Sequence, residues 1–260
     1  METILQGEGW DKGWTQLLEM MGNAAAVTDR SFAVPDGVNN GQYGVGIVID
    51  FFGLAGKYSG FPVDFVYPSM TSVVPANIAL IAGGKNPDEA KKFMAFSMST
   101  EGQQLLFDPK ISRLPIQLKA PAGYPDPQEV AKRAKVQFDA NLSEARYQVV
   151  TSLFDQMVTF RLKELQGATK AIQDAEKALK AKPYARGRDL VKQARALAYT
   201  PLVGAENVKN EQFLELFRKS RRDVEVSKQL SGQEQLWANK ARENYARAQQ
   251  LATEARGLAK

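Results

Sequence analysis

The residues of this chain that could do chemistry are carboxylates, hydroxyls and amines, because its 260 residues include no histidine and no cysteine. Triads built on histidine, thiol nucleophiles, disulfide frameworks and zinc sites that need imidazole or thiolate are therefore excluded. Any metal would have to be held by oxygen ligands. The carboxylates Asp36, Asp50 and Asp64 form no recognisable acid–base pair. We therefore expect a protein that is not an enzyme and that holds no metal and no cofactor.

Charge and composition divide the chain into two regions. Residues 1–120 contain 9 Lys and Arg against 12 Asp and Glu, a net charge of −3. Residues 121–260 contain 25 against 17, a net charge of +8, with 6 of the 20 Gly and 5 of the 12 Pro residues. We expect one domain at 1–120 and a second at 121–260, with 121–140 as a linker or first helix.

The first region is predicted to alternate helices and strands. Helices are expected at 10–21, around 51–58, from Asn86, where Asn-Pro-Asp-Glu is a strong helix start, and from Ser99. Apolar and β-branched residues predict strands at 43–50, 61–68 and 72–83. This order predicts an α/β fold, a mixed sheet covered by helices on both faces.

The second region is predicted to be all helical. Apolar residues recur every three or four positions from Ser143 to about Lys180, as one long helix or as two with a break near Gly167. Further helices are expected at 186–198, 210–222 and 232–258. The last of these carries small residues along one side, which suits close packing against antiparallel helices.

The segment IALIAGGKNPDEAKKFMAFSMSTEGQQLL (78–106) carries a resemblance to a known family. Together with the preceding apolar stretch, Asp and aromatic pair, it resembles the second lobe of type 2 solute-binding proteins of ABC importers. The group concerned includes binders of ferric ion, phosphonates and sugar phosphates. The family shows the pattern GxxNPxxAxxFxxFxxSxEGQ. This chain matches it, with the first glycine displaced by one residue, at Gly83, Asn86, Pro87, Ala90, Phe93, Phe96, Ser99, Glu101, Gly102 and Gln103.

The resemblance implies a function and a compartment. Such proteins capture a solute in a cleft between two α/β lobes and deliver it to a permease in the membrane. The expected ligand is a small polar or anionic solute, and the expected location is periplasmic or extracellular for a full-length secreted protein. Compared with the family, the resemblance implies that this sequence begins inside the second lobe. Its first residues carry Glu2, Glu8 and Asp11 where a signal peptide would carry Lys or Arg, so we expect no signal peptide in this chain.

Asp50 and Phe51 are the first candidate ligand contacts that the resemblance implies. Ferric binders carry two adjacent tyrosines where this chain has Phe51 and Phe52, which cannot bind a metal. Members that bind organic ligands carry an acid at the position of Asp50, whose carboxylate could accept hydrogen bonds from a sugar hydroxyl. Asp50 could instead only cap the helix at 51–58. Phe51 could stack on a ligand or pack in the core.

Four more residues are candidate ligand contacts. Ser69 and Thr71 follow Tyr67-Pro68, where the family often has an acid and Gly-Thr, and their hydroxyls could bind phosphate or sugar oxygens. They could equally form a plain turn. Arg30 and Ser31 precede a segment that resembles a short helix of the family. Arg30 could hold an anionic ligand through its planar guanidinium, or be a solvated charge.

The basic second region supports an alternative function. The runs at 182–195 and 218–222 could bind phosphates, nucleic acid or an acidic membrane surface. The 17 acids interspersed in this region argue against a nucleic-acid partner. The alternative is a helical protein-interaction module that couples the binding lobe to a sensor or permease, with no ligand binding by the chain itself.

Overall fold

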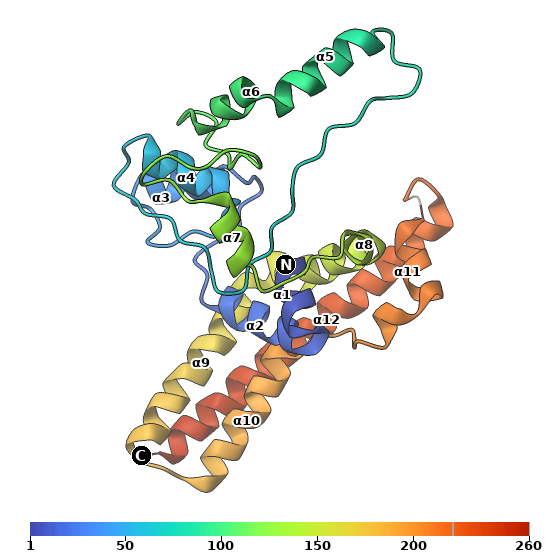
Figure 1. Ribbon diagram of the computed structural model, residues 1–260. Coiled ribbons are helices and arrows are strands. Elements are labelled where there is room, and N and C mark those ends of the chain that lie inside the picture. The colour runs from blue at the N-terminus through green and yellow to red at the C-terminus, as the bar shows by residue number, and fades with distance from the viewer. Residues whose placement is uncertain (220, 260) are drawn as a thin grey trace. The chain divides into compact units, whose positions relative to one another are not determined.

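A computed structural model describes residues 1–219 and 221–259, and helices dominate it (Figure 1). Among these residues no β-strand forms, so the predicted α/β lobe with a mixed sheet is wrong. Packing divides the chain into two compact units. We call Met1–Val27 with Asp139–Lys260 the helical unit and Thr28–Phe138 the inserted unit. This division by packing differs from the division at residue 120 by composition, which stays a prediction.

The helices of each unit have the following bounds. The helical unit contains α1 (Glu2–Glu8), α2 (Trp10–Gly22), α8 (Ala140–Met157), α9 (Leu162–Ala181), α10 (Ala185–Tyr199), α11 (Glu211–Arg218) and α12 (Val224–Leu258), with 3-10 turns η2 (Thr159–Arg161) and η3 (Asn207–Lys209). The inserted unit contains α3 (Ala33–Asn39), α4 (Asp50–Tyr58), α5 (Pro87–Met98), α6 (Thr100–Gln104) and α7 (Pro127–Arg133), with the 3-10 turn η1 (Leu105–Phe107). The predicted helices of both regions are confirmed, with shifts of their ends.

The long helical run predicted from Ser143 forms two helices, and the break lies before Gly167. Val158 leaves the helical backbone at φ −121° and ψ −66°, and η2 follows it. The side chain of Arg161 is buried there, and its Nε donates to the carbonyl oxygen of Ala238 on α12 at 2.8 Å. The Arg161 side chain therefore stabilises the break through a hydrogen bond to another helix. The apolar periodicity of the run does not reveal this contact.

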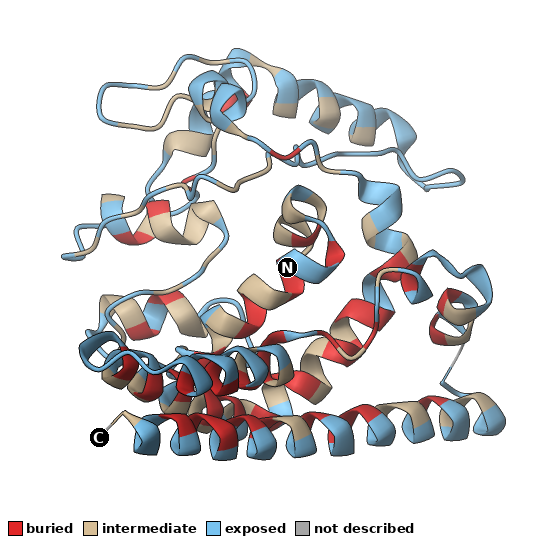
Figure 2. Ribbon diagram, turned by 90° about the horizontal axis from the view of Figure 1, so that it is seen from below, coloured by how far each residue is buried: buried red, intermediate tan, exposed pale blue. Residues whose placement is uncertain are grey.

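The core of the helical unit lies around α12, a helix of 35 residues that packs against α8, α9, α10 and α11. Its buried side contains mostly small residues, which let neighbouring helices approach closely. Figure 2 shows the buried positions as a stripe along one side of this helix. Among them Ala241, Ala248, Ala252 and Ala255 are completely buried.

The first 27 residues complete this helical core. Trp14, Leu17 and Leu18 of α2 are at most 2% exposed and belong to the same hydrophobic cluster as Leu165 and Ile172 of α9. Their spacing of three and four residues places them on one side of α2. The helical unit is thus made of two segments that are far apart in the sequence.

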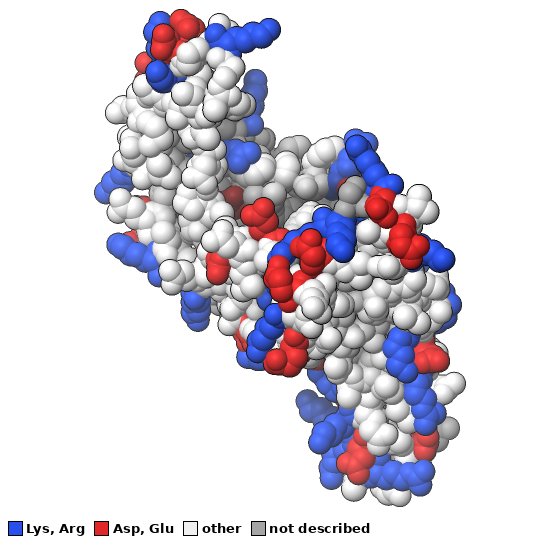
Figure 3. Space-filling model, turned by 90° about the vertical axis from the view of Figure 1, so that its right-hand side faces the viewer, with Lys and Arg blue, Asp and Glu red and all other residues white. Residues whose placement is uncertain are grey.

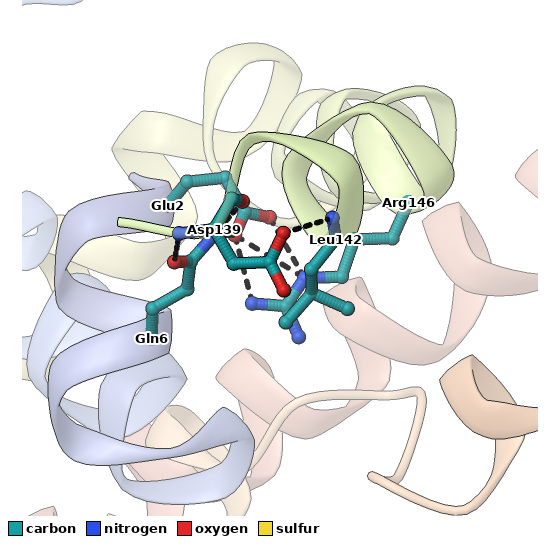
Figure 4. Close-up of polar contacts among 5 residues, drawn as sticks. All are labelled: Glu2, Gln6, Asp139, Leu142 and Arg146. Carbon is teal, nitrogen blue, oxygen red and sulfur yellow. Dashed lines mark hydrogen bonds and ion pairs between the residues drawn. The ribbon is translucent and has the colours of Figure 1, made fainter. Parts of the chain in front are cut away.

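A set of polar contacts holds α1 against the start of α8, where the chain re-enters the helical unit (Figure 4). The guanidinium of Arg146 is 2.7 Å from Oε2 of Glu2, and both side chains are largely buried. The side-chain amide of Gln6 donates to the carbonyl oxygen of Asp139 at 3.0 Å and accepts from its N–H at 2.7 Å. Asp139 also caps α8, because its Oδ1 accepts from the N–H of Leu142 at 3.0 Å.

The three predicted strands of the inserted unit are extended segments without a sheet. Val45, Val66 and Ile81 are 87%, 77% and 79% exposed, and no ladder of backbone hydrogen bonds joins these segments among the described residues. β-propensity reports how side chains fit a pleated surface, and a strand also needs a partner in register. Glycine inside the first segment and proline in the others remove packing area or a backbone donor. The apolar residues expected of strands are present, but in the described residues these segments do not pair with one another through backbone hydrogen bonds.

Candidate functional site

Asp50 lies at the start of α4, and each of its carboxylate oxygens has its own partner. Oδ1 accepts from the backbone N–H of Phe51 at 2.8 Å, at the positive end of the helix dipole. Oδ2 accepts from the hydroxyl of Tyr67 at 3.1 Å. Asp50 is the first residue of α4 and Ile49 is its N-cap, and no side chain makes a capping hydrogen bond there, so the alternative that Asp50 only caps this helix is not what the structure shows. Burial raises the pKa of Tyr67, and the negative charge of Asp50 raises it further, so Tyr67 donates as a neutral phenol.

The ring of Phe51, the residue after Asp50, carries a cation on its face. The guanidinium carbon of Arg113 lies 3.7 Å from the centroid of the Phe51 ring, which is a cation–π contact. The ring of Phe52 packs against the ring of Phe51, with centroids 4.5 Å apart. Arg113 is exposed, and it forms no ion pair with any residue in the described part of the chain. Its guanidinium is therefore held in place by an aromatic face while its hydrogen-bond donors stay available.

Further aromatic rings lie behind these groups in the inserted unit. Tyr58 and Tyr124 stack with centroids 4.5 Å apart, and Phe107 meets Tyr124 edge-on at 5.2 Å. Phe65 contacts the ring of Tyr67 at 4.9 Å. The Tyr124 hydroxyl is shielded from solvent and makes no hydrogen bond of acceptable geometry with a described residue. Burial raises the pKa of Tyr124, although Ser112 acts in the opposite direction.

The other predicted contacts are not joined to this set by any hydrogen bond or ion pair of the described residues. Ser69 is exposed, and the carbonyl oxygen of Thr71 accepts from the N–H of Val136 at 3.2 Å. Arg30 and Ser31 are exposed, and the guanidinium of Arg30 lies 5.9 Å from the ring of Phe32. Across residues 1–219 and 221–259 none of these four shares a hydrogen bond or ion pair with Asp50. Their role in ligand binding stays a prediction.

The site therefore brings together Asp50 and Phe51, which the sequence indicates, with Tyr67 and Arg113, which it does not. Tyr67 lies 17 residues after Asp50, at the end of an extended segment, and no sequence spacing indicates that its hydroxyl donates to that acid. Arg113 lies in a loop 62 residues after Phe51, so no local sequence pattern predicts that the two side chains are in contact. The set offers a hydrogen-bond acceptor, a phenol, an aromatic face and a cation, which suits a small hydroxylated anion. No cluster of acids that could hold a metal exists in the described residues.

A hollow of about 180 Å³ lies elsewhere, on the helical unit between α2 and α10. Its charged groups already bind one another. Arg195 pairs with Glu19, lies 3.1 Å from Glu176, and has its guanidinium 5.3 Å from the ring of Tyr199. Burial raises the pKa of Glu176. Because these partners satisfy each other, we assign this hollow to helix packing and the candidate site to the inserted unit.

Comparison with known proteins gives a family and two relatives. Residues 1–139 match the family described as bacterial extracellular solute-binding protein. The phosphoglycerate transport regulatory protein PgtC of Salmonella typhimurium is 32% identical over 184 residues, which is 69% of this chain and 45% of that protein. The protein of the same name from Salmonella typhi is similar to the same extent. The chain spans less than half the length of these curated relatives. No solved structure matches it.

The family match confirms the expected resemblance to solute-binding proteins, at the level of the family. The matched residues include the whole inserted unit and α1 and α2 of the helical unit. They therefore contain the candidate site at Asp50. In the described residues no helix is long and apolar enough to span a bilayer.

Proposed function

The chain belongs to the bacterial extracellular solute-binding protein family, and on this premise we propose that it binds a small polar or anionic solute for uptake by an ABC importer. The observation that supports the proposal is the cluster of Asp50, Phe51, Tyr67 and Arg113 in the inserted unit. In the proposed mechanism the solute is captured between two lobes, the lobes close, and the solute passes to a membrane permease. The proposed location is the periplasm or the cell exterior.

The chemistry of the cluster favours a phosphorylated hydroxy acid as the solute. The guanidinium of Arg113 can bind a phosphate or carboxylate with two parallel hydrogen bonds. The carboxylate of Asp50 can accept from a ligand hydroxyl, and the Phe51 ring offers an apolar face to the carbon chain. Phosphoglycerate, which the name of the PgtC relatives mentions, carries all three kinds of group. We therefore propose phosphoglycerate or a close analogue as the ligand.

The test is a titration of the isotope-labelled 260-residue chain with 3-phosphoglycerate, followed by amide and arginine side-chain NMR signals. NMR detects complexes as weak as about 1 mM, which corresponds to about −4 kcal/mol. We expect shifts at Phe51, Tyr67 and Arg113. Arg113→Gln should weaken binding at least tenfold, since a hydrogen bond to a charged group contributes about 1.5–3 kcal/mol. Asp50→Asn should weaken it by a similar factor.

The matched control is Lys110→Gln, which removes the same charge three residues from Arg113. It should leave the affinity within about twofold, because a solvated charge at this distance acts through a screened field. Inorganic phosphate and glycerate, titrated separately, should each shift only part of the same set of signals. An absence of shifts at these residues, or equal losses in the Lys110 and Arg113 variants, would contradict the proposal.

A second candidate function is a helical interaction module that couples a binding lobe to a sensor or permease. It is supported by the separate hydrophobic core of the helical unit and by the word regulatory in the name of the PgtC relatives. The predicted basic run at 218–222 offers little free charge for it. Arg218 pairs with Glu211 and Arg221 lies 2.6 Å from Glu234.

The two functions differ in how partner contact depends on the solute site. A photo-crosslinker at Leu236, which is 65% exposed on α12, would report contact with a membrane protein in the source cells. Crosslinks that persist unchanged in the Asp50→Asn/Arg113→Gln double variant would favour the interaction module. Crosslinks that require 3-phosphoglycerate and fail in the double variant would favour solute transport.

A further inference from the structure

Five cations gather at the end of the helical unit where α9 turns into α10. They are exposed, and they lie on the last turns of α9, in the connecting turn and on the first turns of α10. Figure 3 shows Lys and Arg atoms covering much of this end of the unit, which lies at the bottom of Figure 1. We call this set the basic face: Lys177, Lys180, Lys182, Arg188 and Lys192.

The ion pair between Glu176 and Arg195 places Lys180, Arg188 and Lys192 on adjoining sides of the two helices. On α9, Lys180 is four residues from Glu176, so the two occupy the same side of that helix. On α10, Lys192 is three residues before Arg195 and Arg188 is four before that. Because Nη1 of Arg195 is 3.1 Å from Oε1 of Glu176, these two helix sides adjoin.

The basic face is not neutralised by its surroundings. Within the described residues none of its five side chains forms an ion pair or a side-chain hydrogen bond. Nearby cations do have partners, since Arg186 on α10 is 3.3 Å from Glu254 and Arg256 on α12 is 3.5 Å from Asp174. Between residues 177 and 192 the one acid is Asp189. The basic face therefore carries five cations that lack an acidic partner in the described part of the chain.

The shape and composition of this face fit a broad anionic surface better than a protein partner. It is the convex end of a hairpin, and the hollow on this unit is lined by other residues, nearer α2. Lys is depleted in the centres of protein interfaces, which need apolar anchors. Tyr184 lies in the turn, 48% exposed, and an amphipathic ring of this kind suits the level of lipid headgroups.

We propose that the basic face docks the protein on anionic phospholipid headgroups at a bacterial membrane surface. Long flexible cationic side chains reach such headgroups without a shaped pocket. Each Lys or Arg held near an anionic surface strengthens binding about fivefold, so five of them suffice for a measurable and reversible attachment. The attachment is independent of solute binding, because the basic face lies in the helical unit and the candidate site in the inserted unit.

The experiment is co-sedimentation of the full chain with vesicles rich in phosphatidylglycerol and with vesicles of phosphatidylcholine alone. We expect binding to the anionic vesicles only, and its loss between about 0.1 M and about 1 M salt, where the screening length falls from about 10 Å to about 3 Å. Replacing all five residues of the basic face by Gln should weaken binding at least about 100-fold.

The matched control removes the same charge from lysines that already have acidic partners. These exposed residues form ion pairs in other parts of the chain: Lys12, Lys91, Lys92, Lys132 and Lys240. Their replacement by Gln should weaken binding no more than about fivefold, and circular dichroism should show both variants to be equally helical. Equal losses in the two variants would overturn the proposal, as would a wild-type chain that prefers neither kind of vesicle. Selective capture of an acidic protein without any vesicle binding would also overturn it.

Discussion

The buried ion pair between Glu2 and Arg146 supports the strongest stability prediction. Glu2→Gln keeps the size of the side chain but removes the charge that the guanidinium faces. Arg146 makes hydrogen bonds to Glu2 from Nε at 2.9 Å and 3.2 Å and from Nη2 at 2.7 Å. The side chains are only 8% and 12% exposed. The variant therefore leaves a buried cation without a counter-charge.

The expected loss follows from this burial. Breaking one partner of a buried pair destabilises by about 3–5 kcal/mol, because the remaining charge stays desolvated. Here the slight exposure of both groups favours the lower end, about 3 kcal/mol. Replacing both residues by Gln should lose less than the sum of the two single changes, by about 2 kcal/mol. The exposed pair of Lys240 and Glu243 is the control, and Glu243→Gln should change stability by less than about 0.5 kcal/mol.

Tryptophan fluorescence during urea unfolding isolates the relevant unit. The three tryptophans of the chain, Trp10, Trp14 and Trp237, are all buried in the helical unit, so the signal reports its unfolding and not that of the inserted unit. The midpoint and slope give the free energy of unfolding. A loss below about 1 kcal/mol for Glu2→Gln, or additive effects in the double variant, would refute the claim that this contact holds α1 against α8.

Two further changes test the packing of the helical unit with the same fluorescence assay. Gly22→Ala should destabilise by about 1–3 kcal/mol, because the added Cβ would overlap the side chain of Thr169, and an unchanged midpoint would contradict this contact. Burial raises the pKa of Tyr245, whose hydroxyl donates to the carbonyl oxygen of Met157 at 2.8 Å. The folded state therefore holds this proton more tightly than the unfolded state, and stability should fall as the pH rises above about 10. Tyr245→Phe should flatten that slope, and an equal slope in both proteins would count against the assignment.

Sequence pattern predicted the helices well because their information is local. Trp14, Leu17 and Leu18 repeat at helical spacing, and Asn86-Pro87 marks a helix start, so both helices could be predicted. The break at Val158 and the absence of a sheet depend on distant groups. Arg161 reaches α12, and a strand exists only where another segment pairs with it.

The candidate site divides in the same way. Asp50 and Phe51 are neighbours in the chain, and a family resemblance could select them. Tyr67 and Arg113 reach them through tertiary contacts that no spacing records. For the basic run at 218–222, the sequence suggests possible binding to phosphates, nucleic acid or an acidic membrane surface, but in the structure Arg218 pairs with Glu211 on its own helix and Arg221 with Glu234 on α12.

The interrupted sequence of the helical unit has a consequence for synthesis on the ribosome. Helices α1 and α2 emerge before the inserted unit, but α9 and α10, which pack against α2, emerge only after it. Closing so long a loop has an entropic cost, and contacts of large sequence separation form slowly. Trp10 and Trp14 therefore lack these packing partners until α9 and α10 have been synthesised. We expect the nascent segment of α1 and α2 to expose apolar side chains during that time, and such a segment is a target for chaperones.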